Sequence, residues 1–174
     1  MRRGWWTGLV LLVAGAVLLA RGWERERDPA ATGPAGAGPG ESVKASVTGV
    51  TDGDTIDVEV GGRHEDVRYI GIDTPESSPG RPLECFGHEA TRANERLVGE
   101  RTVTLTFGPE LRDRYGRLLA YVRRGDLFVN AELVREGFAR SLTISPNDQF
   151  ADLFQRLERE AGRAARGLWG ACSG

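Results

Sequence analysis

The chain has 174 residues, of which 40% are hydrophobic and 28% are charged, a composition typical of one ordinary globular domain. Its formal net charge is −2, and the part from Glu41 onward carries 18 basic against 22 acidic side chains. A protein that holds nucleic acid by bulk charge needs a basic surplus, so the composition excludes that class and requires any phosphate contact to be local.

The first segment, residues 1–27, has the layout of an export signal. Arg2 and Arg3 precede an apolar run that extends to Ala20. The run is slightly short for a free-standing membrane span, and Leu18 is a poor residue for a cleavage site. A cleaved signal peptide and an N-terminal membrane anchor therefore both stay open. Either form places the rest of the chain outside the cytoplasm, secreted or in contact with a membrane through this segment.

The second segment, residues 28–41, is rich in Pro, Gly and Ala and has almost no large apolar side chain. A stretch of this kind cannot build a core, so it is predicted to be a tether. The folded unit is accordingly predicted to span residues 42–174.

That unit is predicted to begin with strands. Five runs rich in β-branched or aromatic residues are bounded by turns that contain glycine. They cover residues 42–50, 55–60, 66–72, 101–107 and 116–122. Five short strands with interspersed helices indicate a small barrel of the OB architecture, which often presents one face to oligonucleotides. The predicted fold class is α+β, mainly β.

Three later segments space their apolar residues as helices do. The first is GHEATRANERLV, residues 87–98. The second is NAELVREG, in which Asn130 has the position of an N-cap and Gly137 that of a stop. The third is predicted to start with Ser145 as cap and Pro146 as first residue. Its apolar face consists of Phe150, Leu153, Phe154, Leu157 and Ala161.

The first pattern that suggests chemistry is TDGDT, residues 51–55. A DG pair is most often only a hairpin turn, which is the structural alternative. However, Asp54 begins one predicted strand and Asp73 ends another, so the two carboxylates can meet at one rim of a barrel. Together with the backbone carbonyl of Thr74 they predict an oxygen-rich site for a hard cation such as Ca²⁺.

Three charged side chains accompany these oxygens. Glu76 follows Pro75, whose fixed φ stiffens the turn, and a carboxylate there can hold or deprotonate a water molecule. Arg68 lies in an apolar strand, where the structural alternative is a salt bridge. Arg117 follows a turn, and its planar guanidinium suits two-pronged contact with phosphate oxygens. Two such groups and a dication would neutralise the charge of a phosphoryl transition state.

The chain has two cysteines, Cys85 and Cys172, both outside the predicted strands. In an exported protein two cysteines favour a disulfide over two free thiols. A zinc site is not favoured, because His64 and His88 do not stand at ligand spacing from either cysteine.

Taken in order, the motifs TDGDT, VRYIGIDTPE, FGHEA, DRYGRLLAYV, VNAELVREGFA and GLWG resemble the thermonuclease, or staphylococcal-nuclease-like, family over most of positions 47–169. The resemblance implies an enzyme that hydrolyses phosphodiester bonds of DNA and RNA with little sequence preference and leaves 3′-phosphate ends. The residues it assigns are Asp54, Asp73 and the Thr74 carbonyl to Ca²⁺, Arg68 and Arg117 to the phosphate, and Glu76 to the attacking water. Whether Glu76 acts as a base or positions the water stays open. Asp52 would not bind the metal itself but would help to orient the residues that do.

One corner departs from that family. Its members often carry two tyrosines just before the Pro-Asn pair that opens the last helix, where this chain has Leu142 and Ile144. Neither side chain can donate a hydroxyl or stack as an aromatic ring, so weaker binding of the nucleotide is expected.

Two classes of function follow. The first is an exported Ca²⁺-dependent nuclease. The second is a non-catalytic OB-fold domain that binds nucleic acid or protein. Such a domain would not need the charged residues of the site, because the stability of the barrel does not depend on them. A degenerate barrel would be expected to lose the charged set first, and all five charged residues are present, which favours the enzyme.

Overall fold

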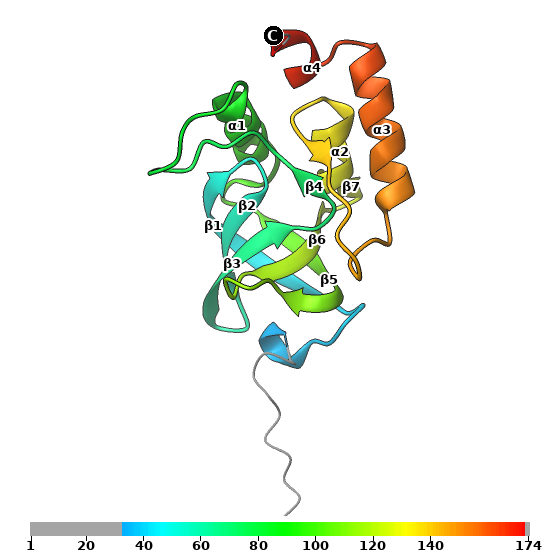
Figure 1. Cartoon of the computed structure of the whole chain (residues 1–174). Coiled ribbons are helices and arrows are strands. Elements are labelled where there is room, and N and C mark those ends of the chain that lie inside the picture. Colours follow the sequence, from blue (N-terminus) through cyan, green and yellow to red (C-terminus); the bar gives the residue numbers. More distant parts are fainter. Residues whose placement is uncertain (1–32, 173–174) are drawn as a thin grey trace, which may run out of the picture.

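The computed structural model describes residues 33–172, and its centre is a five-stranded barrel (Figure 1). The barrel strands are β1 (Ser42–Asp52), β2 (Thr55–Val60), β3 (Arg63–Tyr69), β5 (Thr102–Arg112) and β6 (Leu118–Arg124). They pair antiparallel in the order β3-β2-β1-β5-β6, and a parallel pairing of β3 with β6 closes the ring. Short β7 (Leu127–Phe128) pairs antiparallel with the end of β6. The closed barrel confirms the fold class expected from the sequence.

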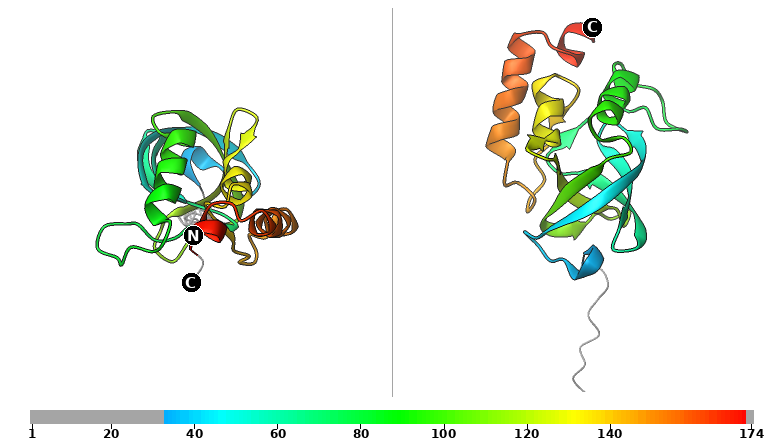
Figure 2. Two further views of the ribbon diagram at one scale, coloured as in Figure 1. Left: turned by 90° about the horizontal axis from the view of Figure 1, so that it is seen from above. Right: turned by 180° about the vertical axis from the view of Figure 1, so that it is seen from behind.

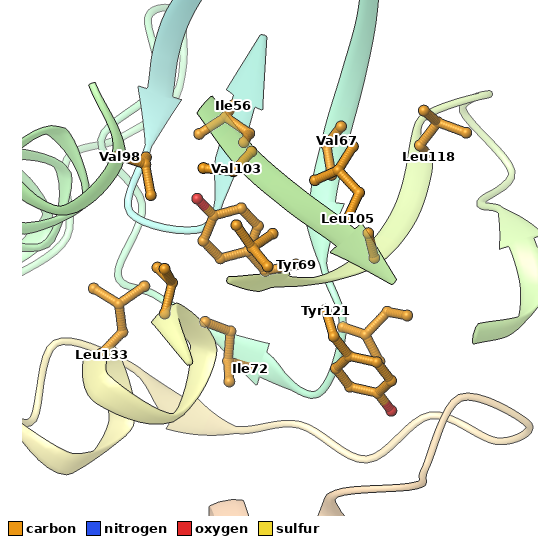
Figure 3. Packing of buried hydrophobic residues seen from close by; sticks show 14 of the residues in the cluster. Ile56, Val67, Tyr69, Ile72, Val98, Val103, Leu105, Leu118, Tyr121 and Leu133 are labelled. Carbon is orange, nitrogen blue, oxygen red and sulfur yellow. The ribbon is translucent and has the colours of Figure 1, made fainter. Parts of the chain in front are cut away.

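Alternating side chains explain why these strands form a barrel. Successive residues of a strand point to opposite faces, so the apolar set of each strand lines the interior. Ile56, Val58 and Val60 of β2 are all buried, and the core continues through all five strands. Figure 3 shows Tyr69 among the labelled core side chains, and its hydroxyl donates to Asn94 Oδ1 at 2.9 Å.

Helices cover one end and one side of the barrel. Helix α1 (Gly87–Val98) lies across the end where the β1–β2 turn is found (Figures 1 and 2). Helix α2 (Val129–Arg135) packs against α3 (Ala151–Arg163), and a short α4 (Leu168–Ala171) follows. The fourth helix is one more than the sequence indicated.

The predicted strand 66–72 is divided in two. It ends at Tyr69 and resumes as β4 (Ile72–Asp73), which pairs with β8 (Arg140–Ser141). The cause is Gly71, whose φ of +81° turns the chain, and where a Cβ would lie 2.4 Å from the ring of Phe154. The break places Asp73 in β4, outside the barrel sheet.

Two predicted helix starts are wrong. Helix α2 begins at Val129, so Asn130 is inside the helix and fully buried rather than an N-cap. Helix α3 begins at Ala151, not at Ser145 and Pro146, because Asn147 is held elsewhere. Its side chain accepts from Glu110 N and donates to Glu110 O, both at 3.0 Å, which ties this loop to the end of β5. The apolar face of α3 was predicted correctly.

Residues 33–41, which belong to the predicted tether, are in contact with the barrel. A 3-10 turn, η2 (Pro34–Gly36), lies at the barrel end away from α1 (Figure 1), and Pro34 and Ala37 are buried. Gly40 N donates to Phe107 O at 2.9 Å, and Phe107 N donates to Glu41 O at 3.0 Å. Residues 33–41 therefore pack on the barrel, whereas residues 28–32 and the predicted export segment 1–27 lie outside the described residues. Within residues 33–172, no helix is long and apolar enough to cross a membrane.

Candidate active site

The tight turn between β1 and β2 buries Asp54 at 4% exposure. Asp54 N donates to Asp52 Oδ1 at 3.0 Å, which fixes the turn. Asp54 Oδ2 accepts from Thr74 N at 2.7 Å and from Thr74 Oγ1 at 3.0 Å. Gly53 permits this approach, because a Cβ there would lie 2.7 Å from Thr74 Oγ1. The turn is thus joined to the corner that follows β4, as the two acidic motifs predicted.

Arg68 joins the two carboxylates that the sequence singled out. Its Nη1 lies 2.8 Å from Asp54 Oδ2 and its Nη2 lies 2.8 Å from Asp73 Oδ1. Nη1 also donates to the carbonyl of Ile72 at 3.0 Å. The salt bridge that was weighed as the structural alternative for Arg68 therefore exists, and it lies inside the candidate site.

The charge balance around Asp54 is uneven. The pKa of Asp54 is raised to about 7. Burial is the largest cause, Arg68 acts to lower the pKa, and the nearby carboxylates of Asp52 and Asp73 act to raise it. A buried carboxylate keeps its charge only when positive charge or donated hydrogen bonds compensate for the lost water. Additional positive charge beside Asp54 and Asp73 would therefore be favourable.

The donor set fits a hard cation. Asp54 and Asp73 offer carboxylate oxygens, and Thr74 adds a backbone carbonyl at the same corner, which is the ligand chemistry that Ca²⁺ prefers. In residues 33–172, no group of three or more His, Cys, Asp or Glu side chains gathers as a metal site. A cation here would thus depend on two carboxylates, the carbonyl and water.

Glu76 is held by the loop that follows it. Its Oε1 accepts from Ser77 N at 3.0 Å and Ser78 N at 2.7 Å, and its Oε2 lies 2.9 Å from Arg81 Nη1. Burial acts to raise the pKa of Glu76, but the hydrogen bonds from Ser78 and Arg81 outweigh it, and the pKa lies below its ordinary value. Glu76 is therefore an ionised acceptor at neutral pH.

Arg117 reaches the site because β3 and β6 close the barrel. The register pairs Arg68 with Leu119, and Arg117 stands two residues before Leu119, directly ahead of β6. Its Nε donates to Asp113 Oδ2 at 2.8 Å, and its guanidinium carbon is 5.6 Å from the centre of the Tyr115 ring. Asp113 thus holds the side of the guanidinium at Nε.

All six residues of the predicted active site line one cavity of about 370 Å³. They are Asp54, Arg68, Asp73, Thr74, Glu76 and Arg117. Sequence reasoning missed Ser78 and Arg81, which line the same cavity and contact Glu76. They lie in an exposed loop without periodicity, so nothing in the pattern pointed to them.

A second cavity of about 520 Å³ adjoins the first and shares Arg68, Tyr115 and Arg117 with it. Leu142 and Ile144 line it and are 37% and 58% exposed. The aliphatic corner that departs from the family pattern is therefore next to Arg68 and Arg117.

Cys85 and Cys172 form a disulfide, with their Cα atoms 5.9 Å apart. The bond connects the segment after Glu76 to the end of α4.

Comparison with known proteins places the chain in a family. Residues 66–171 match the family described as staphylococcal nuclease homologues. A thermonuclease of Staphylococcus hyicus is 33% identical over 164 residues, which cover 94% of this chain and 96% of the relative. A thermonuclease of Staphylococcus intermedius is 38% identical over 69% of this chain and 72% of its own length. Endonuclease YncB of Bacillus subtilis is 36% identical over 73% of this chain and 62% of its own length. The chain therefore belongs to the staphylococcal nuclease family, and it is a phosphodiester-hydrolysing nuclease of that family.

Proposed function

We propose that the protein is an exported, Ca²⁺-dependent nuclease that cleaves DNA and RNA with little sequence preference and leaves 3′-phosphate ends. The observation that carries this proposal is the single cavity in which Arg68, Arg117 and Glu76 stand beside the Asp54–Asp73 carboxylates. The three parts have different roles: the arginines face a phosphate, the carboxylates a cation, and Glu76 a water molecule.

The side chains in this cavity suit a phosphate more than a base. Arg68 and Arg117 offer guanidinium groups, whose planar shape matches two phosphate oxygens. Contacts of this type hold the backbone and carry no sequence information directly, which supports broad specificity. Glu76 is ionised because its pKa lies below the ordinary value, and its carboxylate accepts a proton from a water molecule or orients that molecule.

Asp54, Asp73 and the Thr74 carbonyl are the residues that would hold Ca²⁺. The ion would add positive charge where negative charge develops on the phosphoryl group. Arg68 already joins both carboxylates, so it orients the ligand set from the barrel wall.

The metal requirement is the first prediction. Purified protein should degrade DNA and RNA with Ca²⁺ and lose activity in a chelator, because Asp54 and Asp73 offer a loose oxygen cage for the larger ion. Mg²⁺ should support activity poorly, since it demands near-ideal octahedral ligands. The measurement is release of acid-soluble nucleotides, followed by analysis of the product ends.

A Glu76→Gln variant serves as the matched control for metal binding, since it keeps the carboxylates at Asp54 and Asp73. It should bind Ca²⁺ as the native protein does and hydrolyse slowly. Equal rates with Ca²⁺ and with chelator would remove Ca²⁺ from the proposal, and 5′-phosphate products would remove the proposed cleavage position.

The aliphatic corner gives a second prediction. Leu142→Tyr should lower KM more than it changes kcat, with a gain in affinity of up to ~1 to 3 kcal/mol if the ring stacks on a base. Leu142 lines the cavity next to Arg68 and Arg117, so the new ring would be within reach of the nucleotide. Steady-state kinetics on a short oligonucleotide at saturating Ca²⁺ measure the effect.

The matched control is Leu83→Tyr. Leu83 is an exposed leucine that lines neither cavity, so its substitution should leave KM unchanged. A KM for Leu142→Tyr that equals or exceeds that of the native enzyme would show that this corner does not touch substrate.

Export is the remaining part of the proposal, and it rests on residues 1–27 of the sequence. A reporter that works only outside the cytoplasm, fused after Ser42, should be active in cells. The same fusion without residues 1–27 is the control and should be inactive. Activity of both, or of neither, would contradict export by this segment.

A further inference from the structure

The loop after Glu76 contains no helix or strand until α1, and residues 79–85 are all exposed. Its two ends meet at one point. Glu84 N donates to Glu76 O at 2.9 Å, and Glu76 N donates to Glu84 Oε2 at 3.1 Å. The residue that follows this closure is Cys85, which is bonded to Cys172. The disulfide therefore lies at the base of the loop that carries Glu76.

The other half of the bond is attached to a firm support. Helix α4 begins with Leu168, which is 2% exposed and whose N–H donates to Gly137 O at 2.9 Å. Gly137 and Gly167 approach so closely that a Cβ on either would lie 2.3 Å from a carbonyl oxygen. Cys172 thus connects the loop to the turn that ends α2, on a part of the fold distant in sequence.

The orientation of Glu76 depends on this same loop. Three groups fix its carboxylate, namely Ser77 N, Ser78 N and Arg81 Nη1, and all three belong to residues 77–84. On the near side the loop is attached to the barrel, because Ser78 Oγ donates to Asp52 Oδ2 at 3.0 Å. On the far side the covalent attachment is the disulfide.

We propose that the Cys85–Cys172 disulfide positions Glu76, so that the nuclease reaches its full turnover only when this bond is formed. The proposal rests on the proposed function of Glu76. Loss of the bond leaves the far end of the loop held by the two hydrogen bonds between Glu84 and Glu76 and by the start of α1, and this weaker attachment widens the range of orientations of Ser77, Ser78 and Arg81. The arginines Arg68 and Arg117 belong to the barrel and keep their places, so phosphate binding persists while the water is held less well.

The bond is open to exchange, because Cys85 is exposed. A thiolate of a dithiol reductant attacks one sulfur, the S–S bond breaks, and a mixed disulfide forms. The second thiol of the reductant then displaces the remaining enzyme sulfur. The reductant is oxidised to its cyclic disulfide, and the enzyme gains two electrons and two protons as two thiols. A chain still in a reducing compartment would accordingly have the less active form.

The test compares the oxidised full chain with the same protein treated with dithiothreitol, at saturating Ca²⁺ on a short oligonucleotide. Thiol titration in denaturant should find no free thiol before treatment and two after it. We expect kcat to fall by about 10- to 100-fold on reduction, the size associated with a misplaced catalytic group. KM should stay close to that of the oxidised enzyme, and reoxidation should restore kcat.

Two variants separate positioning from general stability. Cys85→Ala combined with Cys172→Ala should have the low kcat at all times and not respond to dithiothreitol. Val103→Ala removes a buried side chain from β5 that lines neither cavity, and it keeps the bond. It should be less stable to urea and yet keep the kcat of the native enzyme.

The outcomes are distinct. A reduced enzyme with two free thiols, native circular dichroism and unchanged kcat would overturn the proposal. Unfolding on reduction would overturn it as well, because the bond would then be required by the whole fold rather than by the loop. If Glu76→Gln retains native kcat in the oxidised protein, the role of Glu76 in the proposed function fails instead, whatever dithiothreitol does.

Discussion

Replacement of Arg117 by lysine is expected to slow hydrolysis by about 100- to 1000-fold, equivalent to about 2.7 to 4 kcal/mol of barrier, by analogy with removal of one transition-state donor. The substitution keeps the charge but removes the planar group. Arg117 uses Nε to contact Asp113 Oδ2 at 2.8 Å, so its two terminal nitrogens are not needed for that contact, and the residue lines the cavity. A lysine has one ammonium and cannot serve both partners in this geometry.

The measurement is kcat/KM on an oligonucleotide at saturating Ca²⁺. Arg114→Lys is the matched control, because Arg114 lies three residues earlier, is exposed, and stacks on the same Tyr115 ring with 4.7 Å to its centre. It should remain close to native activity. Near-native turnover of Arg117→Lys would refute a two-pronged phosphate contact at this position.

The second large effect is expected on stability. Asn130 is fully buried, and its side chain joins β6 to the turn between β3 and β4: Oδ1 accepts from Val122 N at 2.8 Å and Nδ2 donates to Ile70 O at 2.9 Å. Asn130→Leu leaves both backbone groups buried without partners, at about 1 to 3 kcal/mol each. The free energy of unfolding should therefore drop by about 2 to 6 kcal/mol, a large part of the total for a small domain.

Urea denaturation measures this loss. Arg135→Leu places the same residue on the exposed side of the same helix and should change the unfolding free energy by no more than about 0.5 kcal/mol. Because leucine favours helix more than asparagine does, helix propensity works against the expected loss. A stability of Asn130→Leu equal to that of Arg135→Leu would show that the two bonds of Asn130 contribute nothing net.

Asn130 also illustrates what sequence patterns can and cannot predict. Asparagine is a preferred N-cap residue, and this general preference is the reason why the sequence predicts a wrong start for α2. The helix starts at Val129, one residue before Asn130. The amide of Asn130 instead bonds to backbone groups on β6 and just before β4. Only the folded barrel brings those groups to Asn130, because they lie 8 and 60 residues away from it in the sequence.

The same contrast holds in the site. The meeting of Asp54 with the corner after Asp73 was predictable, since each stands at the end of a strand and strand ends share a rim. The contact of Arg81 with Glu76 was not, because an exposed loop has no period from which its path can be inferred. Alternating apolar residues fixed the barrel strands, whereas the break at Gly71 depends on Phe154, which comes more than eighty residues later.

The packing of residues 33–41 on the barrel places Gly33 at the end of the barrel away from α1 (Figure 1). β1 begins beside η2 and runs 11 residues to the turn that contains Asp54 (Figure 1). At about 3.3 Å per residue, the ten steps along this strand span at most about 33 Å. A surface, bead or fused partner attached directly at Gly33 would thus be at the far end of the barrel from that turn, and a long polymer could pass the cavity without meeting the support.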